Sequence, residues 1–278
     1  MRKLVRAQTT ERLKKLDAEL GRVAHKPKDA DAIHDLRVSI RRLSRELQVF
    51  RAWFEPGQVK GIRRRLRKLM AHCAAVRNCD IAIEVLRAAG WRNPGLLAGL
   101  EQEGRRMRED LARKLANWRR RDRVLEWRRH LRVKRSAASR ELQDSTDESA
   151  RRLLPAMMED LFRAGREATR PDSSHHRMHQ FRLKTKRVRY TLELFESVYG
   201  RRTKQVMDSL KGLQEKLGAI NDCATTLTMI GRRRGAAGMV RRLAGEREAE
   251  FRGYWKKHFG PRERARWEAV LSATDGKK

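Results

Sequence analysis

The chain has 278 residues, of which 68 are Lys or Arg and 35 are Asp or Glu, so its formal net charge is +33 at pH 7. Charge of one sign at this density opposes compaction and calls for a polyanionic partner, for which nucleic acid, an acidic lipid surface and phosphate polymers all qualify. The composition excludes a disordered basic tail, since 39% of the residues are hydrophobic, and the lack of a long apolar run excludes a membrane-spanning helix.

Nearly every segment has the spacing of an amphipathic helix, with apolar residues at i, i+3, i+4 and i+7 and almost no alternation with a period of two. Prolines fall between these segments, where they end one helix and begin the next; Pro155 is the exception, and predicts a late helix start or a kink. The sequence therefore predicts an all-α protein. The expected helices are 8–24, 29–54, 57–77, 79–90, 94–120, 122–134, 147–168, 174–198, 201–218, 222–234, 237–259 and 261–272.

The N-terminal residues lack the apolar segment of a secretion signal. Three cysteines, Cys73, Cys79 and Cys223, are too few for a disulfide framework and lack CxxC spacing. Their odd number, together with the lack of an export signal, indicates a reducing compartment. We therefore expect a cytoplasmic protein.

An internal duplication is the strongest organising signal. The apolar stripe of helix 29–54 recurs 145 residues later in helix 174–198, where His179 matches His34 and Arg182 matches Arg37. The next helix recurs at an offset of 144 residues, so that Cys223 matches Cys79. We infer two similar helical bundles, 1–135 and 147–278, joined by the polar segment SRELQDSTDES. The matching apolar residues are Ile33, Leu36, Ile40, Leu43, Leu47 and Phe50 in the first copy and Met178, Phe181, Thr185, Val188, Leu192 and Phe195 in the second.

Beside each apolar stripe runs a stripe of basic residues spaced three or four apart, which places them on one side of the helix. The stripe of helix 29–54 contains His34, Arg37, Arg41 and Arg45, with Arg42 beside them. The stripe of helix 174–198 contains His179, Arg182, Lys186 and Arg189, with Arg187 beside them.

Cations that flank a helix seam are ordinarily paired with carboxylates. Here segment 34–45 contains four Arg and a single acid, Asp35, and segment 179–190 contains no acid. Unpaired cations at a helix interface are unfavourable unless an anion compensates them, and an excess of Arg over Lys favours bidentate recognition of phosphate. The two stripes are therefore predicted to bind an anion, with the two histidines donating hydrogen bonds to the same ligand.

A weaker basic face follows in the next helix of each copy, with Lys60 and Arg67 matching Lys204 and Lys211. These four residues are secondary candidates for anion binding. Asn78 and Asp222 also match across the copies, and we expect both to be N-caps of new helices.

Motifs of phosphate chemistry are missing from the sequence, which has no Walker loop, no GxGxxG, no HExxH and no carboxylate cluster able to hold Mg²⁺ or Mn²⁺. A phosphohydrolase or kinase normally needs a metal, a general base or an activated nucleophile. The sequence therefore predicts a binding protein rather than an enzyme, with no cofactor and no metal site.

The segments HDLRVSIRR at 34–42 and HQFRLKTKRVRY at 179–190 resemble the two signature helices of the CHAD family, the conserved histidine α-helical domain. The segments LRKLMAHCAAVRNCD (66–80) and LKGLQEKLGAINDC (210–223) are similar to its following helix and turn, and the resemblance covers the whole chain as a single domain, 1–278.

This resemblance implies two four-helix bundles related by a pseudo-two-fold axis, with the signature helices lining a basic channel that binds inorganic polyphosphate, and an association with polyphosphate granules. The first copy departs from the pattern at Ser44, which matches Arg189 of the second copy and where a basic residue is expected. Arg45, at the next position, would have to supply this positive charge.

The leading hypothesis is therefore a non-enzymatic polyphosphate-binding protein. The alternative is non-specific binding of DNA or RNA, for which the run RRRDRVLEWRRHLRVKR at 119–135 is the best candidate. Few aromatic residues are interleaved with the basic runs, as single-strand stacking would require. An enzyme that acts on phosphate polymers is the third hypothesis, and it would reveal itself by metal-dependent release of phosphate.

Overall fold

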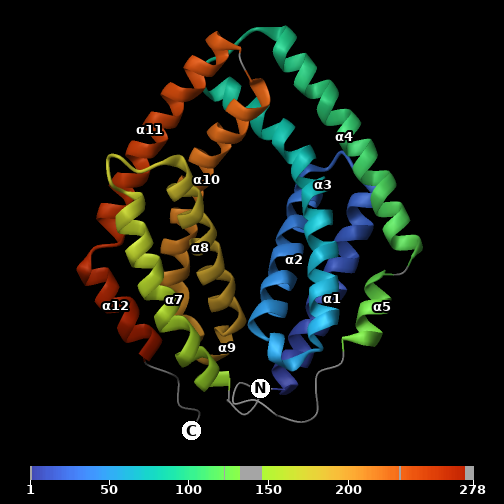
Figure 1. The fold of residues 1–278 in the computed structure, drawn as a ribbon, viewed down its shortest axis with the longest axis vertical. Coiled ribbons are helices and arrows are strands. Elements are labelled where there is room, and N and C mark those ends of the chain that lie inside the picture. The colour runs from blue at the N-terminus through green and yellow to red at the C-terminus, as the bar shows by residue number, and fades with distance from the viewer. Residues whose placement is uncertain (1, 122, 132–145, 232, 273–278) are drawn as a thin grey trace. The chain divides into compact units, whose positions relative to one another are not determined.

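The structure, a computed structural model, describes residues 2–121, 123–131, 146–231 and 233–272 (Figure 1). Every regular element in these ranges is helical, which confirms the predicted all-α class. Within the same ranges no helix is both long and apolar enough to cross a membrane. The predicted linking segment lies outside the described residues as far as residue 145.

The chain forms two compact bodies, Met1–Glu84 with Arg92–Gln143, and Val85–Trp91 with Asp144–Lys278. The helices of the first body are α1 (Arg2–His25), α2 (Ala30–Val49), the short 3-10 helix η1 (Arg51–Trp53), most of α3 (Pro56–Ala88), α4 (Pro94–Arg120) and α5 (Arg123–His130). The second body contains α7 (Thr146–Ala168), α8 (His175–Leu194), α9 (Glu196–Tyr199), η2 (Gly200–Thr203), α10 (Lys204–Ile230), α11 (Arg234–His258) and α12 (Pro261–Ser272).

In each body a long helix is followed by the helix with the basic stripe, a short irregular segment and a second long helix. All twelve residues of the two predicted apolar stripes are buried. They pack α2 against α1 in the first body, and α8 against α7 and α10 in the second. The derivation of the two bodies from one duplicated unit, with limits at 135 and 147, stays a prediction.

The core of the second body is built largely of aromatic rings. Phe162 of α7 lies at its centre, with ring centroids 5.5 Å from Trp267 of α12 and 6.0 Å from Trp255 of α11. Phe181 of α8 meets Trp255 edge to face at 5.3 Å. These contacts hold α8 in place from its apolar side, and they leave its basic side at the edge of the core.

Two predicted helix breaks are wrong. Asn78 lies inside the single helix α3 and Asp222 inside the single helix α10, where four helices had been expected. An Asn or Asp is a good N-cap, but it does not end the preceding helix unless the backbone turns away. The chain turns at two glycines with positive φ, Gly90 at 85° and Gly231 at 58°, a region that favours glycine.

Proline gave a correct signal at most positions, since Pro56, Pro94 and Pro261 each begin a helix. The predicted late start at Pro155 is wrong, because α7 begins at Thr146 and runs through that proline. Pro155 is exposed, whereas its neighbour Leu154 is fully buried, so the apolar face of α7 continues across it.

Candidate anion-binding site

The first basic stripe is positioned by the way α2 begins and packs. Asp29 caps the helix by accepting a hydrogen bond of 3.0 Å from the backbone N–H of Ala32. Because the apolar face of α2 is buried, the residues beside that face lie at the edge of the core. His34 is exposed there, and the four arginines of the stripe are half-buried, namely Arg37, Arg41, Arg42 and Arg45.

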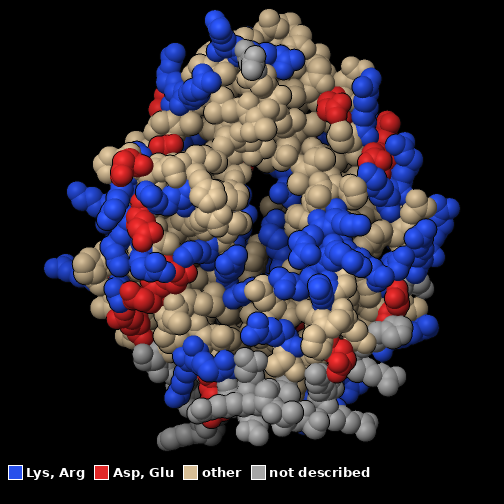
Figure 2. All heavy atoms as spheres, in the orientation of Figure 1, with Lys and Arg blue, Asp and Glu red and all other residues tan. Residues whose placement is uncertain are grey.

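His34 lies in a strongly positive environment. Although the residue is exposed, partial desolvation of its ring lowers the pKa of His34. The charge of Arg41 lowers this pKa further, as do those of Arg37 and Arg77, against an opposing effect of Asp35. Arg41 and Arg37 come from α2 itself, whereas Arg77 comes from α3, so two helices contribute to one cationic cluster. Figure 2 shows Lys and Arg side chains gathered over the visible face of the first body, which contains α2 and α3.

Neighbouring groups on α3 hold the cationic side chains in place. Both terminal nitrogens of Arg77 donate to the carboxylate of Glu84, at 3.0 and 3.2 Å. Arg37 lies close enough to Cys73 to lower the pKa of its thiol, although burial outweighs this effect and raises that pKa to about 12. Arg37 is therefore packed at the seam between α2 and α3.

The second stripe is built in the same way on α8. Ser174 caps this helix by accepting a 3.3 Å hydrogen bond from the backbone N–H of Arg177. The residues of the stripe are half-buried apart from the exposed Arg187, and they are His179, Arg182, Lys186 and Arg189. At the matching positions Arg37 and Arg182, the Nε atom is buried in both bodies.

Each stripe histidine lies near the same position of the following long helix. In the second body, Nδ1 of His179 lies 3.0 Å from Oδ1 of Asn221 on α10. Asn221 in turn accepts a 2.9 Å hydrogen bond at its backbone oxygen from Thr225. In the first body the matching neighbour of His34 is Arg77, which is residue 221 less the offset of 144. In the second body, therefore, a neutral amide lies beside His179. In the first body a cationic guanidinium occupies the matching position near His34.

Arg189 of the α8 stripe has a carboxylate and an aromatic ring beside it. Its Nε lies 3.6 Å from Oε1 of Glu193, and its guanidinium lies 4.9 Å from the centre of the Tyr190 ring. The matching pair in the first body is Ser44 and Gln48, so both members of the ion pair are replaced by neutral residues. The net charge of this pair of positions is thus the same in both copies. The replacement of Arg by Ser44 therefore removes less positive charge from the first stripe than the sequence comparison indicates.

The secondary candidates fall into two different surroundings. Lys60 and Arg67 are exposed and line a pocket of about 390 Å³ together with other basic residues. Lys204 lines a pocket of about 440 Å³ that also contains Glu193, Glu196 and Asp208, and Lys211 is exposed. The neighbours of Lys60 are therefore basic, whereas those of Lys204 include acidic residues.

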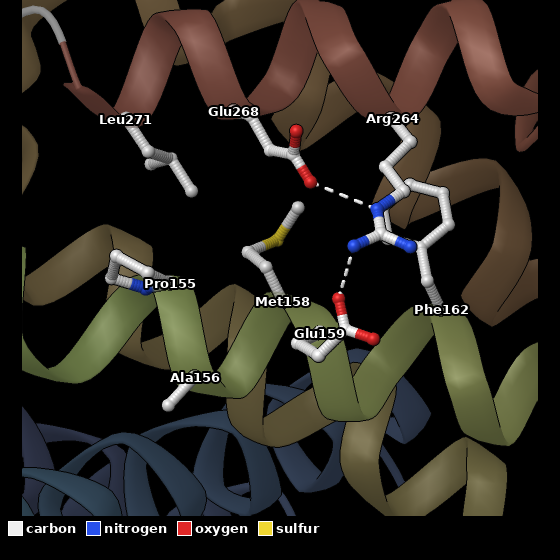
Figure 3. Close-up of a pocket in the computed structure, with 8 residues that line it drawn as sticks. All are labelled: Pro155, Ala156, Met158, Glu159, Phe162, Arg264, Glu268 and Leu271. Atoms are coloured by element: carbon white, nitrogen blue, oxygen red, sulfur yellow. Dashed lines mark hydrogen bonds and ion pairs between the residues drawn. The ribbon is translucent and has the colours of Figure 1, made fainter.

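A third pocket, of about 390 Å³, lies between α7 and α12 and does not suit an anion (Figure 3). Arg264 points there between two carboxylates. It donates to Glu268 at 2.8 Å and also to Glu159. The remaining lining of this pocket is mainly apolar and includes Pro155, Met158 and Leu271. The described residues contain no group of three His, Cys, Asp or Glu side chains that could hold a metal ion.

The basic run at 119–135, which the nucleic-acid alternative requires, is only partly described. Residues 122 and 132–135 lie outside the described residues, and the remainder forms the end of α4 and the short helix α5. Trp127 of this run is buried and meets Trp118 edge to face at 5.3 Å. Its ring is therefore used in packing. Across the described residues no large hydrophobic side chain is classed as exposed, and base stacking needs accessible aromatic rings.

Sequence reasoning missed Arg77 and Asn221 as neighbours of the stripe histidines. Each of them directly precedes a residue with a high N-cap propensity, Asn78 or Asp222. The signal was present, because residues 77 and 221 match at the offset of 144 that relates the two long helices.

A family model for the CHAD domain matches residues 7–231. This range covers more than half of the sequence, and the chain therefore belongs to the CHAD domain family. No curated protein sequence matches the chain.

Two solved structures share the fold. The crystal structure of the CHAD domain from the plant Ricinus communis is 21% identical, with a TM-score of 0.67 over 98% of this chain and 92% of that chain. PptA from Streptomyces chartreusis is 16% identical, with a TM-score of 0.63 over 96% of this chain and 99% of that chain. At these identities the likeness concerns the fold.

Proposed function

We propose that this CHAD domain protein binds inorganic polyphosphate through the basic stripes of α2 and α8, and that it associates with polyphosphate granules in the cytoplasm. The observation that carries the proposal is the positive environment of His34, to which Arg37 and Arg41 of α2 and Arg77 of α3 contribute. A chain of linked phosphates carries charge at short, regular intervals, so it can contact several guanidinium groups in succession.

Membership of the CHAD family supports this ligand over other polyanions. The Arg-rich composition favours bidentate contacts with phosphate, and the lack of exposed aromatic rings in the described residues disfavours single-stranded nucleic acid. Binding without chemistry is also part of the proposal. It predicts that polyphosphate incubated with the protein and Mg²⁺ or Mn²⁺ releases no phosphate, and metal-dependent release would contradict this part.

The site can be tested by removing one arginine from each stripe. Charge-assisted hydrogen bonds contribute about 1.5–3 kcal/mol each, so Arg37→Gln with Arg182→Gln should weaken polyphosphate binding by a factor of roughly 100 or more. The matched control is Arg128→Gln with Arg129→Gln on α5, which removes the same charge from an exposed surface and should change the affinity less than about threefold.

Because the Nε atoms of Arg37 and Arg182 are buried, thermal unfolding of the variant must first show that it folds. A second stripe variant, Arg41→Gln with Lys186→Gln, covers the case in which it does not. Equal affinities of a folded stripe variant and the control would contradict the assignment of the site.

A further inference from the structure

The start of α3 carries a basic pocket outside the two stripes. It has a volume of about 390 Å³ and lies where the chain leaves α2, passes through η1 and enters α3. Four of its lining side chains are cationic, and Ala52, Pro56 and Val59 form its apolar part. The cationic residues are Arg51, Lys60, Arg63 and Arg67.

These cations line one pocket, and among the described residues no ion pair neutralises them. In the described part of the chain, no carboxylate oxygen lies within 4.0 Å of a nitrogen of the four side chains. Arg63 donates instead to the neutral amide oxygen of Gln48, at 3.1 Å. Burial lowers the pKa of Arg63, and the neighbouring charge of Arg67 lowers it further. The first turn of α3, which begins at Pro56, adds the positive end of the helix dipole.

The matching pocket of the second body has the opposite character. Its lining includes Glu193, Glu196 and Asp208 around Lys204. At the repeat offsets, Gln48 is matched by Glu193 and Arg51 by Glu196. A chain with a net charge of +33 thus places acidic residues at this point in one body and basic residues in the other. The basic pocket is therefore a specific feature of the first body, and the general charge of the chain does not account for it.

The pocket continues the line of the α2 stripe. Arg45 and Gln48 are three residues apart, which puts them on the same side of the helix, and Gln48 contacts Arg63 of the pocket. From His34 to Gln48 the helix rises roughly 21 Å, at 1.5 Å per residue. A flexible chain of phosphates bound along α2 would reach the pocket at the end of this helix.

We propose that the basic pocket is an additional phosphate subsite, which binds the part of a polyphosphate chain that extends past the α2 stripe. The proposal rests on the proposed function, and it assigns new binding residues, Arg51 and Arg63, to the first body alone. The apolar part of the pocket lowers the local dielectric and so strengthens the attraction between its cations and a phosphate. The acidic pocket of the second body takes no part in binding.

The test compares two double variants that lose the same charge. Lys60→Gln with Arg67→Gln removes two exposed cations from the basic pocket, and Lys204→Gln with Lys211→Gln removes the two matching lysines from the second body. Titration calorimetry with inorganic tripolyphosphate measures the number of sites, and a second titration with long-chain polyphosphate measures the affinity.

The pocket variant is expected to bind one tripolyphosphate fewer than the wild type and to lose at least tenfold in affinity for the long chain. The control variant should keep the wild-type number of sites and lose less than threefold. If the two variants had the same number of sites and the same affinity, the subsite would be overturned. Long-chain binding by the wild type would still uphold the proposed function in that case. Failure of the wild type to bind the long chain would overturn the proposed function itself.

ATP, which carries a triphosphate on a nucleoside, separates the two sources of linked phosphates. A polyphosphate subsite should bind ATP no more tightly than tripolyphosphate. Tighter binding of ATP that is lost in the pocket variant would identify a nucleotide site and would contradict the proposal.

Discussion

Glu46 is a buried acid that should make the stability of the first body depend on pH. It lies on α2 with its side chain fully buried. Thr9 donates a 2.5 Å hydrogen bond to its Oε1, and Nε of Arg12 lies 3.6 Å from its Oε2. Burial nevertheless outweighs both contacts and raises the pKa of Glu46 from 4.5 to about 7.

The direction of the effect follows from the number of protons that each state binds. Between pH 4.5 and 7 the folded chain keeps a proton on Glu46 that the unfolded chain has released, so the free energy of unfolding falls as pH rises through this window. The interval from 4.5 to about 7 corresponds to about 3 kcal/mol in total. Glu46→Gln keeps a side chain of the same shape without the titrating group, and it should not show this loss.

The assay is urea unfolding followed by circular dichroism between pH 5 and pH 8. Relative to the wild type, the Glu46→Gln variant should gain most of the 3 kcal/mol across this range, because the other titrating groups are common to both proteins. Thr191→Val, at the matching buried position of α8, is the control, and it should show the pH dependence of the wild type. A constant difference between Glu46→Gln and the wild type at all pH values would refute the reasoning.

Further predictions concern packing and the pH dependence of binding. At Gly165 of α7 a Cβ would collide with the ring of Trp255, so Gly165→Ala should destabilise the second body by about 1–3 kcal/mol, whereas Gly238→Ala, whose Cβ would meet nothing within 4 Å, should be neutral or stabilising in thermal unfolding. His34 has a lowered pKa in the free protein, and bound phosphate would favour its protonated form, so polyphosphate affinity should rise as pH falls from 8 to 5.5. His34→Gln should flatten this rise, and an unchanged pH profile would exclude His34 from the site.

The helical class and the buried faces follow directly from the sequence, because a period of 3.6 residues decides which side of a helix is apolar. The stripe positions from Ile33 to Phe50 and from Met178 to Phe195 are all buried as expected. The helix breaks at Asn78 and Asp222 were wrong since capping propensity is local, whereas the actual ends at Gly90 and Gly231 depend on a backbone turn.

The candidate site was predicted only along single helices. The stripes of α2 and α8 follow from residue spacing, but Arg77 joins His34 from another helix, and such a neighbour depends on how α2 packs against α3. Two cations of the basic pocket, Lys60 and Arg67, were predicted as secondary candidates. Arg51 and Arg63 were missed, because they come together with these two only after the chain has turned through η1. The repeat offset compensates in part, since it relates Arg77 to Asn221, both of which lie beside a stripe histidine.

Binding of polyphosphate across a salt series, with DNA of matched charge as competitor, tests the central claim most directly. The proposed function predicts tight binding of polyphosphate that weakens steeply as the salt concentration rises, as expected when the binding of several cations releases counterions. It also predicts that DNA does not displace the bound polyphosphate. Displacement by DNA in proportion to its charge would show that the overall charge of +33 governs binding. The stripes of α2 and α8 would then lose their assigned role.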